Sequence, residues 1–176
     1  MKAIILMALF QLNLNAATKV IDSEVNFTAV GRPAFIKATG ILPIEKADLT
    51  LKEGMLTGNI EVPLSKLNSG IETRDEHLKE KYLEVAKYPK ALLSFTNIPL
   101  KELKEGQNIK AKLTLHGQTR EIPLEVKVEG DKSRLKVESD FEVILTDFNI
   151  ELPSFQGITA AKNVKIKVDS TFSLDE

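Results

Sequence analysis

Few side chains of this chain are suited to catalysis, and the two histidines come first because the chain contains no cysteine. Neither His77 nor His116 has a second histidine four residues away, so we expect no metal site. Asp75 and His77 resemble an acid–base pair, but residues i and i+2 of a helix point to different faces. An enzyme would need His77, His116, Asp75 or Asp147 to converge in one cavity, and the spacing gives no sign of this. We therefore expect a protein that is not an enzyme, with both histidines structural or solvent-exposed.

Signals for phosphate binding, nucleophilic catalysis and nucleic-acid binding are also missing. The chain has no glycine-rich phosphate loop and no Gly-x-Ser-x-Gly motif. The formal net charge is -1, so the chain does not have the excess of basic residues that is typical of a nucleic-acid-binding protein.

The guanidinium of Arg74, beside Asp75, can hold a polar head group or fix a helix to the end of a strand. We favour the second interpretation of Arg74.

One main α-helix is predicted at about residues 73–87. Its start has the capping-box pattern, with Thr73 followed three residues later by Glu76. Pro89 disfavours a helical conformation at Tyr88, so the helix is expected to end there. A narrow apolar face, which needs a sheet to cover it, is formed by Leu78, Tyr82 and Val85.

The rest of the chain alternates apolar and polar residues with a period of two, which predicts β-strands. The segment 107–115 is typical: every second residue is apolar from Ile109 onward, and the residues between are polar. About eight such strands with regular turns predict an antiparallel barrel or a sandwich, and the long strands with one charged face favour a closed barrel.

The interior of an eight-stranded barrel is either filled by side chains or wide enough for one small ligand. Small residues in phase with the apolar faces, Ala111, Ser139 and Ser170, and the absence of tryptophan indicate that space is left over. A fully self-packed barrel is the alternative. If the apolar face lines the interior, an elongated apolar ligand is expected. Its predicted contacts are Phe27, Leu93, Phe95, Leu113, Leu115, Val126, Phe141, Val143 and Phe172.

The N-terminus resembles a secretory signal peptide. Met1-Lys2 is a short basic region, residues 3–10 are apolar, and a more polar stretch leads to Ala16-Ala17. Residues 1–17, cut after Ala16 or Ala17, are therefore expected to be removed, which leaves one domain over residues 18–176. The apolar run is far shorter than the ~20 residues that span a bilayer, so the protein is not expected to span a membrane.

Several motifs together resemble the YceI-like family. They are Thr-Arg-Asp-Glu-His-Leu at 73–78, Lys-Tyr-Pro at 87–89, Leu-Ser-Phe at 93–95 and Leu-Thr-Leu-His-Gly at 113–117. The resemblance covers the chain after the signal segment, and it implies an exported bacterial protein with an extended, lipocalin-like barrel that holds an isoprenoid or a related lipid. Where the family often has an Arg-Ser-Asp-Phe-Gly-like motif, this chain matches it only at Asp147 and Phe148.

The resemblance implies a periplasmic or secreted protein that carries a polyisoprenoid or an isoprenoid quinone in its barrel. The sequence requires no other cofactor, and a homodimer is one of the assemblies that it allows. A ligand-free structural or stress-response barrel is the alternative function, and an enzyme acting on a lipid is a more distant one.

Overall fold

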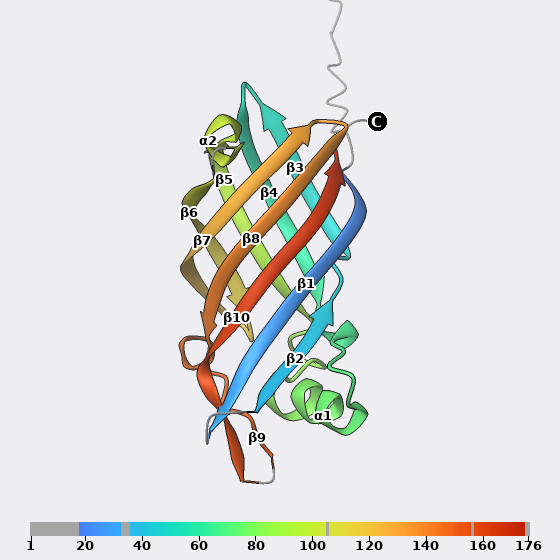
Figure 1. The fold of residues 1–176 in the computed structure, drawn as a ribbon, viewed down its shortest axis with the longest axis vertical. Coiled ribbons are helices and arrows are strands. Elements are labelled where there is room, and N and C mark those ends of the chain that lie inside the picture. Colours follow the sequence, from blue (N-terminus) through green and yellow to red (C-terminus); the bar gives the residue numbers. More distant parts are fainter. Residues whose placement is uncertain (1–17, 33–35, 105, 156, 175–176) are drawn as a thin grey trace, which may run out of the picture.

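The computed structural model describes residues 18–32, 36–104, 106–155 and 157–174, and most of them form antiparallel strands (Figure 1). The strands lie in one sheet in the order β2-β1-β10-β8-β7-β6-β5-β4-β3, and β9 pairs with β10. The predicted signal segment, residues 1–17, lies outside the described residues. The strands are β1 (Lys19–Arg32), β2 (Lys37–Leu42), β3 (Lys46–Lys52), β4 (Met55–Pro63), β5 (Lys90–Pro99), β6 (Gln107–Leu115), β7 (Gln118–Asp131), β8 (Arg134–Ile144), β9 (Ser154–Phe155) and β10 (Ile158–Ser173).

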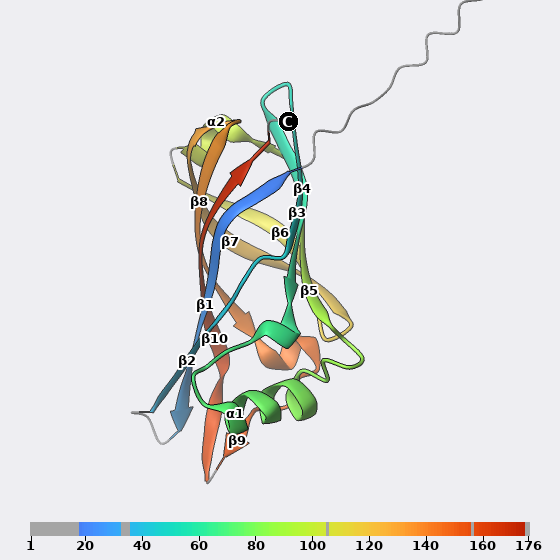
Figure 2. The ribbon, with the colours of Figure 1, turned by 90° about the vertical axis from the view of Figure 1, so that its right-hand side faces the viewer.

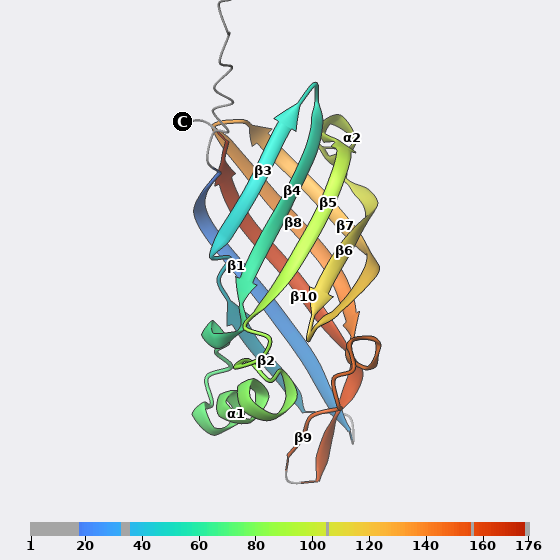
Figure 3. The ribbon, with the colours of Figure 1, turned by 180° about the vertical axis from the view of Figure 1, so that it is seen from behind.

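The sheet curls into an elongated barrel, so the prediction of a mainly β, antiparallel barrel is confirmed (Figure 3). On β7, Ile122, Leu124, Val126 and Val128 are buried while the residues between them are exposed, because successive side chains of a strand point to opposite faces. The expected count of eight strands is too low. Two features raise the count. A segment around Pro43, which cannot donate a backbone hydrogen bond, separates β2 from β3, and the two residues of β9 form a further short strand.

The barrel has a seam where the start of β1 lies beside β3 (Figure 2). Within the described part of the chain, β1 and β3 are not ladder neighbours, and side-chain hydroxyls join residues in or next to these two strands instead. The Thr18 hydroxyl accepts from the backbone N–H of Leu49 at 2.7 Å and donates to its carbonyl at 3.1 Å. The Ser23 hydroxyl accepts from the N–H of Ile44 at 2.9 Å. These hydroxyls satisfy backbone groups that an edge strand would otherwise leave unpaired.

Short helical segments cover the two ends of the barrel. The helix α2 (Leu100–Lys104) lies at one end, and α1 (Glu72–His77) lies at the other (Figures 1 and 3). Two 3₁₀ turns, η1 (Leu64–Lys66) and η3 (Leu145–Phe148), and a π turn, η2 (Leu78–Tyr82), complete the helical structure of the described residues. Over the described ranges, none of these helices has the length and apolar character needed to cross a bilayer.

The predicted helix over about 73–87 is shorter than expected and begins differently. It begins after Ile71, which makes no side-chain cap, so the expected capping box of Thr73 is wrong. The regular helix ends at His77 and is followed by the π turn η2, which ends at Tyr82. The backbone of Glu84 is left-handed, with φ of 44°, and its carbonyl accepts from the N–H of Tyr88 at 2.9 Å. This turn stops the helix before it reaches Pro89.

A tight hairpin joins β6 to β7 and places one histidine at the α1 end. Its two central residues, His116 and Gly117, have φ of 49° and 70°, the positive values of a type I′ turn. A Cβ atom at Gly117 would lie 2.7 Å from the ring of Tyr88, so glycine also allows the close approach of that ring.

Candidate ligand-binding cavity

An apolar cavity of about 390 Å³ runs inside the barrel. Its wall is made by inward-facing side chains of the strands β1 to β8 and β10, together with residues of the helical segments at both ends. The volume falls within the roughly 300–1,000 Å³ of sites that hold a small molecule. The alternative of a fully self-packed barrel is therefore wrong.

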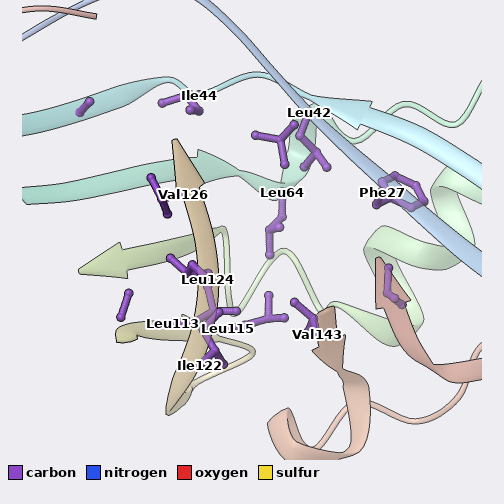
Figure 4. Close-up of a cluster of buried hydrophobic side chains, with 14 of the residues drawn as sticks. Phe27, Leu42, Ile44, Leu64, Leu113, Leu115, Ile122, Leu124, Val126 and Val143 are labelled. Carbon is purple, nitrogen blue, oxygen red and sulfur yellow. The ribbon is translucent and has the colours of Figure 1, made fainter. Parts of the chain in front are cut away.

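The cavity brings together all nine residues predicted as ligand contacts. They come from β1, β5, β6, β7, β8 and β10, and each lines the wall: Phe27, Leu93, Phe95, Leu113, Leu115, Val126, Phe141, Val143 and Phe172. Figure 4 shows Phe27, Leu113, Leu115, Val126 and Val143 directed from different strands toward a common interior. Their contact with a ligand stays a prediction.

Sequence reasoning missed lining residues at both ends and in the β3–β4 wall. Leu49 and Leu56 line the cavity from β3 and β4. Leu103 lines it from α2, a segment that the sequence analysis did not recognise as helix. The spacing of Leu100 and Leu103 could have revealed that face, because residues i and i+3 of a helix share a side. Of the small residues expected to leave space, only Ser139 lines the cavity, whereas Ala111 and Ser170 are buried outside it.

The α2 end of the cavity is closed and forms its floor. Leu103, Val128 and Phe172 line this end with only 2 %, 1 % and 1 % of their surfaces exposed. All three are apolar, so the floor offers contacts by dispersion and excludes water. A ligand therefore cannot pass through this end without moving core side chains.

The α1 end is open and forms the mouth. Ile36 lines it although 49 % of its surface is exposed, and the lining residues His77 and Ser154 are exposed as well. Of the five polar side chains among the described lining residues, four gather here, those of Arg74, His77, Tyr82 and Ser154. The fifth, Ser139, lies deeper. Access to the cavity is therefore from the α1 end, past a polar rim.

Arg74 and Asp75 fix α1 to the preceding loop, whereas the favoured interpretation places this contact at the end of a strand. The Arg74 guanidinium donates from Nε to the Ser69 hydroxyl and from Nη2 to the Ser69 carbonyl, both at 2.8 Å. The buried Asp75 carboxylate accepts from the Ser69 N–H at 3.0 Å and from the Ser69 hydroxyl. A carboxylate held in this way has its charge compensated by directed donors.

His116 is a structural residue at the same end. Its Nδ1 lies 3.1 Å from the carbonyl oxygen of Phe148, and its Nε2 lies 2.7 Å from a carboxylate oxygen of Glu84. The Tyr88 ring meets the imidazole edge-on, with 4.6 Å between ring centroids. The side chain is mostly buried, and it connects η3 to the turn that ends the helix. Phe148, one of the two residues matching the family motif, is itself buried in the core.

The groups named for an enzyme do not form one site in this arrangement. Asp75 bonds to Ser69, His116 bonds to Glu84 and Phe148, and Asp147 is exposed. Of the four, only His77 lines the cavity. In the ranges that the structure covers, no cluster of three histidine, aspartate or glutamate side chains is arranged to bind a metal ion.

Comparison with known proteins gives both a family and a fold. The sequence profile of the YceI-like domain matches residues 13–172. The UPF0312 protein YE1254 of Yersinia enterocolitica is 32 % identical over 99 residues, which cover 52 % of this chain and 50 % of that protein. Protein YceI of Salmonella arizonae is 31 % identical over 99 residues, 52 % of this chain and 51 % of that one. The chain thus spans about half the length of the curated relatives it matches.

Two solved structures share the fold at low sequence identity. BcnA of Burkholderia cenocepacia has a TM-score of 0.69 at 16 % identity, covering 85 % of this chain and 95 % of its own. A polyisoprenoid binding domain from Saccharophagus degradans, implicated in plant cell wall breakdown, has a TM-score of 0.67 at 17 % identity, covering 90 % of this chain and 98 % of its own.

Proposed function

The chain belongs to the YceI-like domain family, and from this premise we propose that it is a periplasmic binding protein that carries a long isoprenoid or a similar apolar lipid. The observation that carries the proposal is the cavity, which has a wall of apolar side chains, a closed floor and an open mouth. Such a wall suits an elongated hydrocarbon, because it offers dispersion and dehydration with few directed hydrogen bonds. The structural neighbour from Saccharophagus degradans, a polyisoprenoid binding domain, supports the same ligand class.

The apolar wall is sufficient for useful affinity without any catalytic or metal group. At roughly 0.3 kcal/mol per heavy atom, each ten carbons held in the cavity contribute about 3 kcal/mol. A chain of about 40 carbons would reach about 12 kcal/mol, which corresponds to a nanomolar dissociation constant, only if every carbon made contact with the protein. Affinity should rise with chain length as long as added carbons find wall to contact.

Mass spectrometry of organic extracts from the purified protein tests the proposal directly. We expect an isoprenoid or isoprenoid quinone in the extract, or uptake of added polyprenol by lipid-free protein. Repeated absence of lipid from extracts, together with no uptake of added polyprenol or quinone, would overturn the proposed function.

Two neighbouring substitutions on β5 separate an effect on binding from an effect of charge. Phe95 lines the cavity, whereas Thr96 is exposed, so Phe95→Asp and Thr96→Asp add the same carboxylate in different surroundings. Phe95→Asp should abolish uptake, because it places an unpaired charge in an apolar wall. Thr96→Asp should bind as the parent does. Circular dichroism of both variants establishes that they are folded, and equal uptake by folded forms of both would count against the cavity as the site.

Export is part of the proposal and has its own test. The basic, apolar and small-residue regions of residues 1–17 support a cleaved signal peptide. The intact mass of the protein recovered from a periplasmic fraction should correspond to a chain that begins after Ala16 or Ala17. Recovery of the full-length chain from the cytoplasm alone would contradict it.

A further inference from the structure

Two serine hydroxyls on the inner side of the sheet are buried and unpaired. Ser139 of β8 and Ser170 of β10 have 8 % and 2 % of their surfaces exposed. Within the described ranges, neither hydroxyl oxygen has a hydrogen-bond partner. A buried polar group without a partner is unfavourable, and each such group in a native protein calls for an explanation. The residue Ser139 lines the cavity and Ser170 does not, and the hydroxyl oxygen of each is covered by neighbouring atoms, so a rotation of the Ser139 side chain must turn its hydroxyl to a ligand.

Ser139 lies in the deep part of the cavity. Along β8 and into η3, the lining residues from mouth to floor are Leu145, Val143, Phe141, Ser139 and Val137. The cross-strand neighbours of Ser139 are Val126 on β7 and Val168 on β10, and both also line the wall. The Ser139 hydroxyl is therefore a single polar group among apolar side chains. The next inward-facing residue toward the floor, Val137, is the last residue of β8 that lines the cavity.

The surroundings of Ser139 restrict the chemistry of its partner. A serine hydroxyl can donate one hydrogen bond and accept others, so it pairs with a hydroxyl, carbonyl or ether oxygen. Among the described residues that line the cavity, the charged or ionisable side chains Arg74, His77 and Tyr82 are all at the mouth, so none of the described lining residues near the floor would neutralise a phosphate. Burial of an unpaired charge there would be strongly unfavourable. The group that fits is a neutral oxygen.

We propose that the Ser139 hydroxyl binds a neutral oxygen of the bound lipid, so that the oxygen-bearing end lies near the floor and the hydrocarbon tail runs toward the mouth. The ligand is then an isoprenoid alcohol, ether or quinone that enters with its oxygen first. This inference rests on the proposed function, because it concerns the orientation of a lipid in the same cavity. It also explains why a polar residue stands at this position of the wall.

The test compares Ser139→Ala with Ser170→Ala, a matched control that removes the other buried and unpaired hydroxyl. The probes are geranylgeraniol and the hydrocarbon of the same skeleton that lacks the hydroxyl group. One hydrogen bond is expected to contribute about 3- to 10-fold in affinity. Ser139→Ala should weaken binding of the alcohol by about that factor and leave the hydrocarbon unchanged, and Ser170→Ala should alter neither. Both variants should unfold at or above the parental midpoint, since each loses an unsatisfied group.

Infrared spectroscopy of a bound isoprenoid quinone with a ¹³C-labelled carbonyl gives a second measurement. A hydrogen bond lowers the carbonyl stretching frequency, so the lowered band should appear in the parent and in Ser170→Ala and be lost in Ser139→Ala. Equal effects of the two variants on alcohol binding, or a carbonyl band that Ser139→Ala leaves unmoved, would overturn the inference. Failure of the parent protein to bind either probe or quinone would instead overturn the proposed function.

Discussion

The two ends of the barrel are built from different interactions. At the floor, Leu103, Val128 and Phe172 are almost completely buried and make apolar contacts. At the mouth, directed hydrogen bonds hold the chain: the Tyr82 hydroxyl accepts from the N–H of Ser154 at 3.0 Å and donates to its carbonyl at 3.2 Å. The two ends thus have different roles: the floor contributes to the stability of the fold, and the mouth gives access to the cavity.

The difference has a physical reason. Apolar burial is non-directional and grows with area, so a floor made of large side chains resists opening. The hydrogen bonds between Tyr82 and Ser154 are partly buried and each contributes only a modest net free energy, so local opening should begin there. A binding protein with this division can admit a ligand at the mouth without unfolding its core.

The largest expected effect is loss of the floor. Phe172→Ala should lower the free energy of unfolding by about 3–5 kcal/mol, because it removes a fully buried ring and leaves a hole. Ile36→Ala at the mouth should change it by no more than about 0.5 kcal/mol, because half of that side chain is already exposed. Urea unfolding of both variants measures the difference. Similar losses at the two positions would show that the ends are not distinct in stability.

A smaller effect is expected from the hydrogen bonds of the mouth. Tyr82→Phe removes the hydroxyl that pairs with both backbone groups of Ser154, and it should cost about 1 kcal/mol. Amide hydrogen exchange at Ser154 should become faster, whereas amides at the floor should keep their rates. Ser154→Ala is the matched control, because it preserves the backbone groups that Tyr82 binds. Faster exchange at the floor in Tyr82→Phe would argue that the two ends are coupled.

The smallest effect is expected on the outer face beside the floor. Lys127 and Glu129 flank the buried Val128, and their side chains form an exposed ion pair with 2.7 Å between Nζ and Oε1. The hydrogen bond from Lys127, and then its charge, lower the pKa of Glu129. Lys127→Met should therefore raise the pKa of Glu129 toward its ordinary value, as measured by NMR titration.

The sign of this pKa shift fixes its effect on stability. A carboxylate whose pKa is lowered by folding stabilises the protein above its unfolded pKa and loses that contribution as the pH falls through its folded pKa. Because both side chains are exposed, we expect no resolvable change in the unfolding midpoint near neutral pH. A clear drop of the midpoint in Lys127→Met would mean that the outer face helps to hold the floor.

Much of the wall could be predicted from the sequence, because the pleat of a strand fixes which side chains share a face. Once Val126 is placed inside, Leu124 and Val128 must follow, and no distant contact can reverse that. The nine predicted lining residues lie around one cavity for this reason. The residues missed, such as Leu103, belong to a short helix whose position depends on what it covers.

The helix shows where local patterns fail. Thr73 and Glu76 have the spacing of a capping box, yet the carboxylate of Asp75 bonds to Ser69 and the helix begins after Ile71. Its end depends on the left-handed Glu84, whose carboxylate reaches His116 from the hairpin between β6 and β7. These contacts compete with the local signals and cannot be read from neighbouring residues.

The sequence by itself determined the class of fold and the apolar character of the inner face, because both follow from a period of two that every strand carries within itself. The tertiary structure alone decided which end of the cavity is closed, because the floor joins Leu103 of α2 with Phe172 of β10, residues far apart in the chain. It also decided that Ser139 lines the cavity while Ser170, which has the same inward phase on its own strand, does not. The alternation within a strand fixes the side of the sheet on which a residue lies, but not whether that residue borders the cavity.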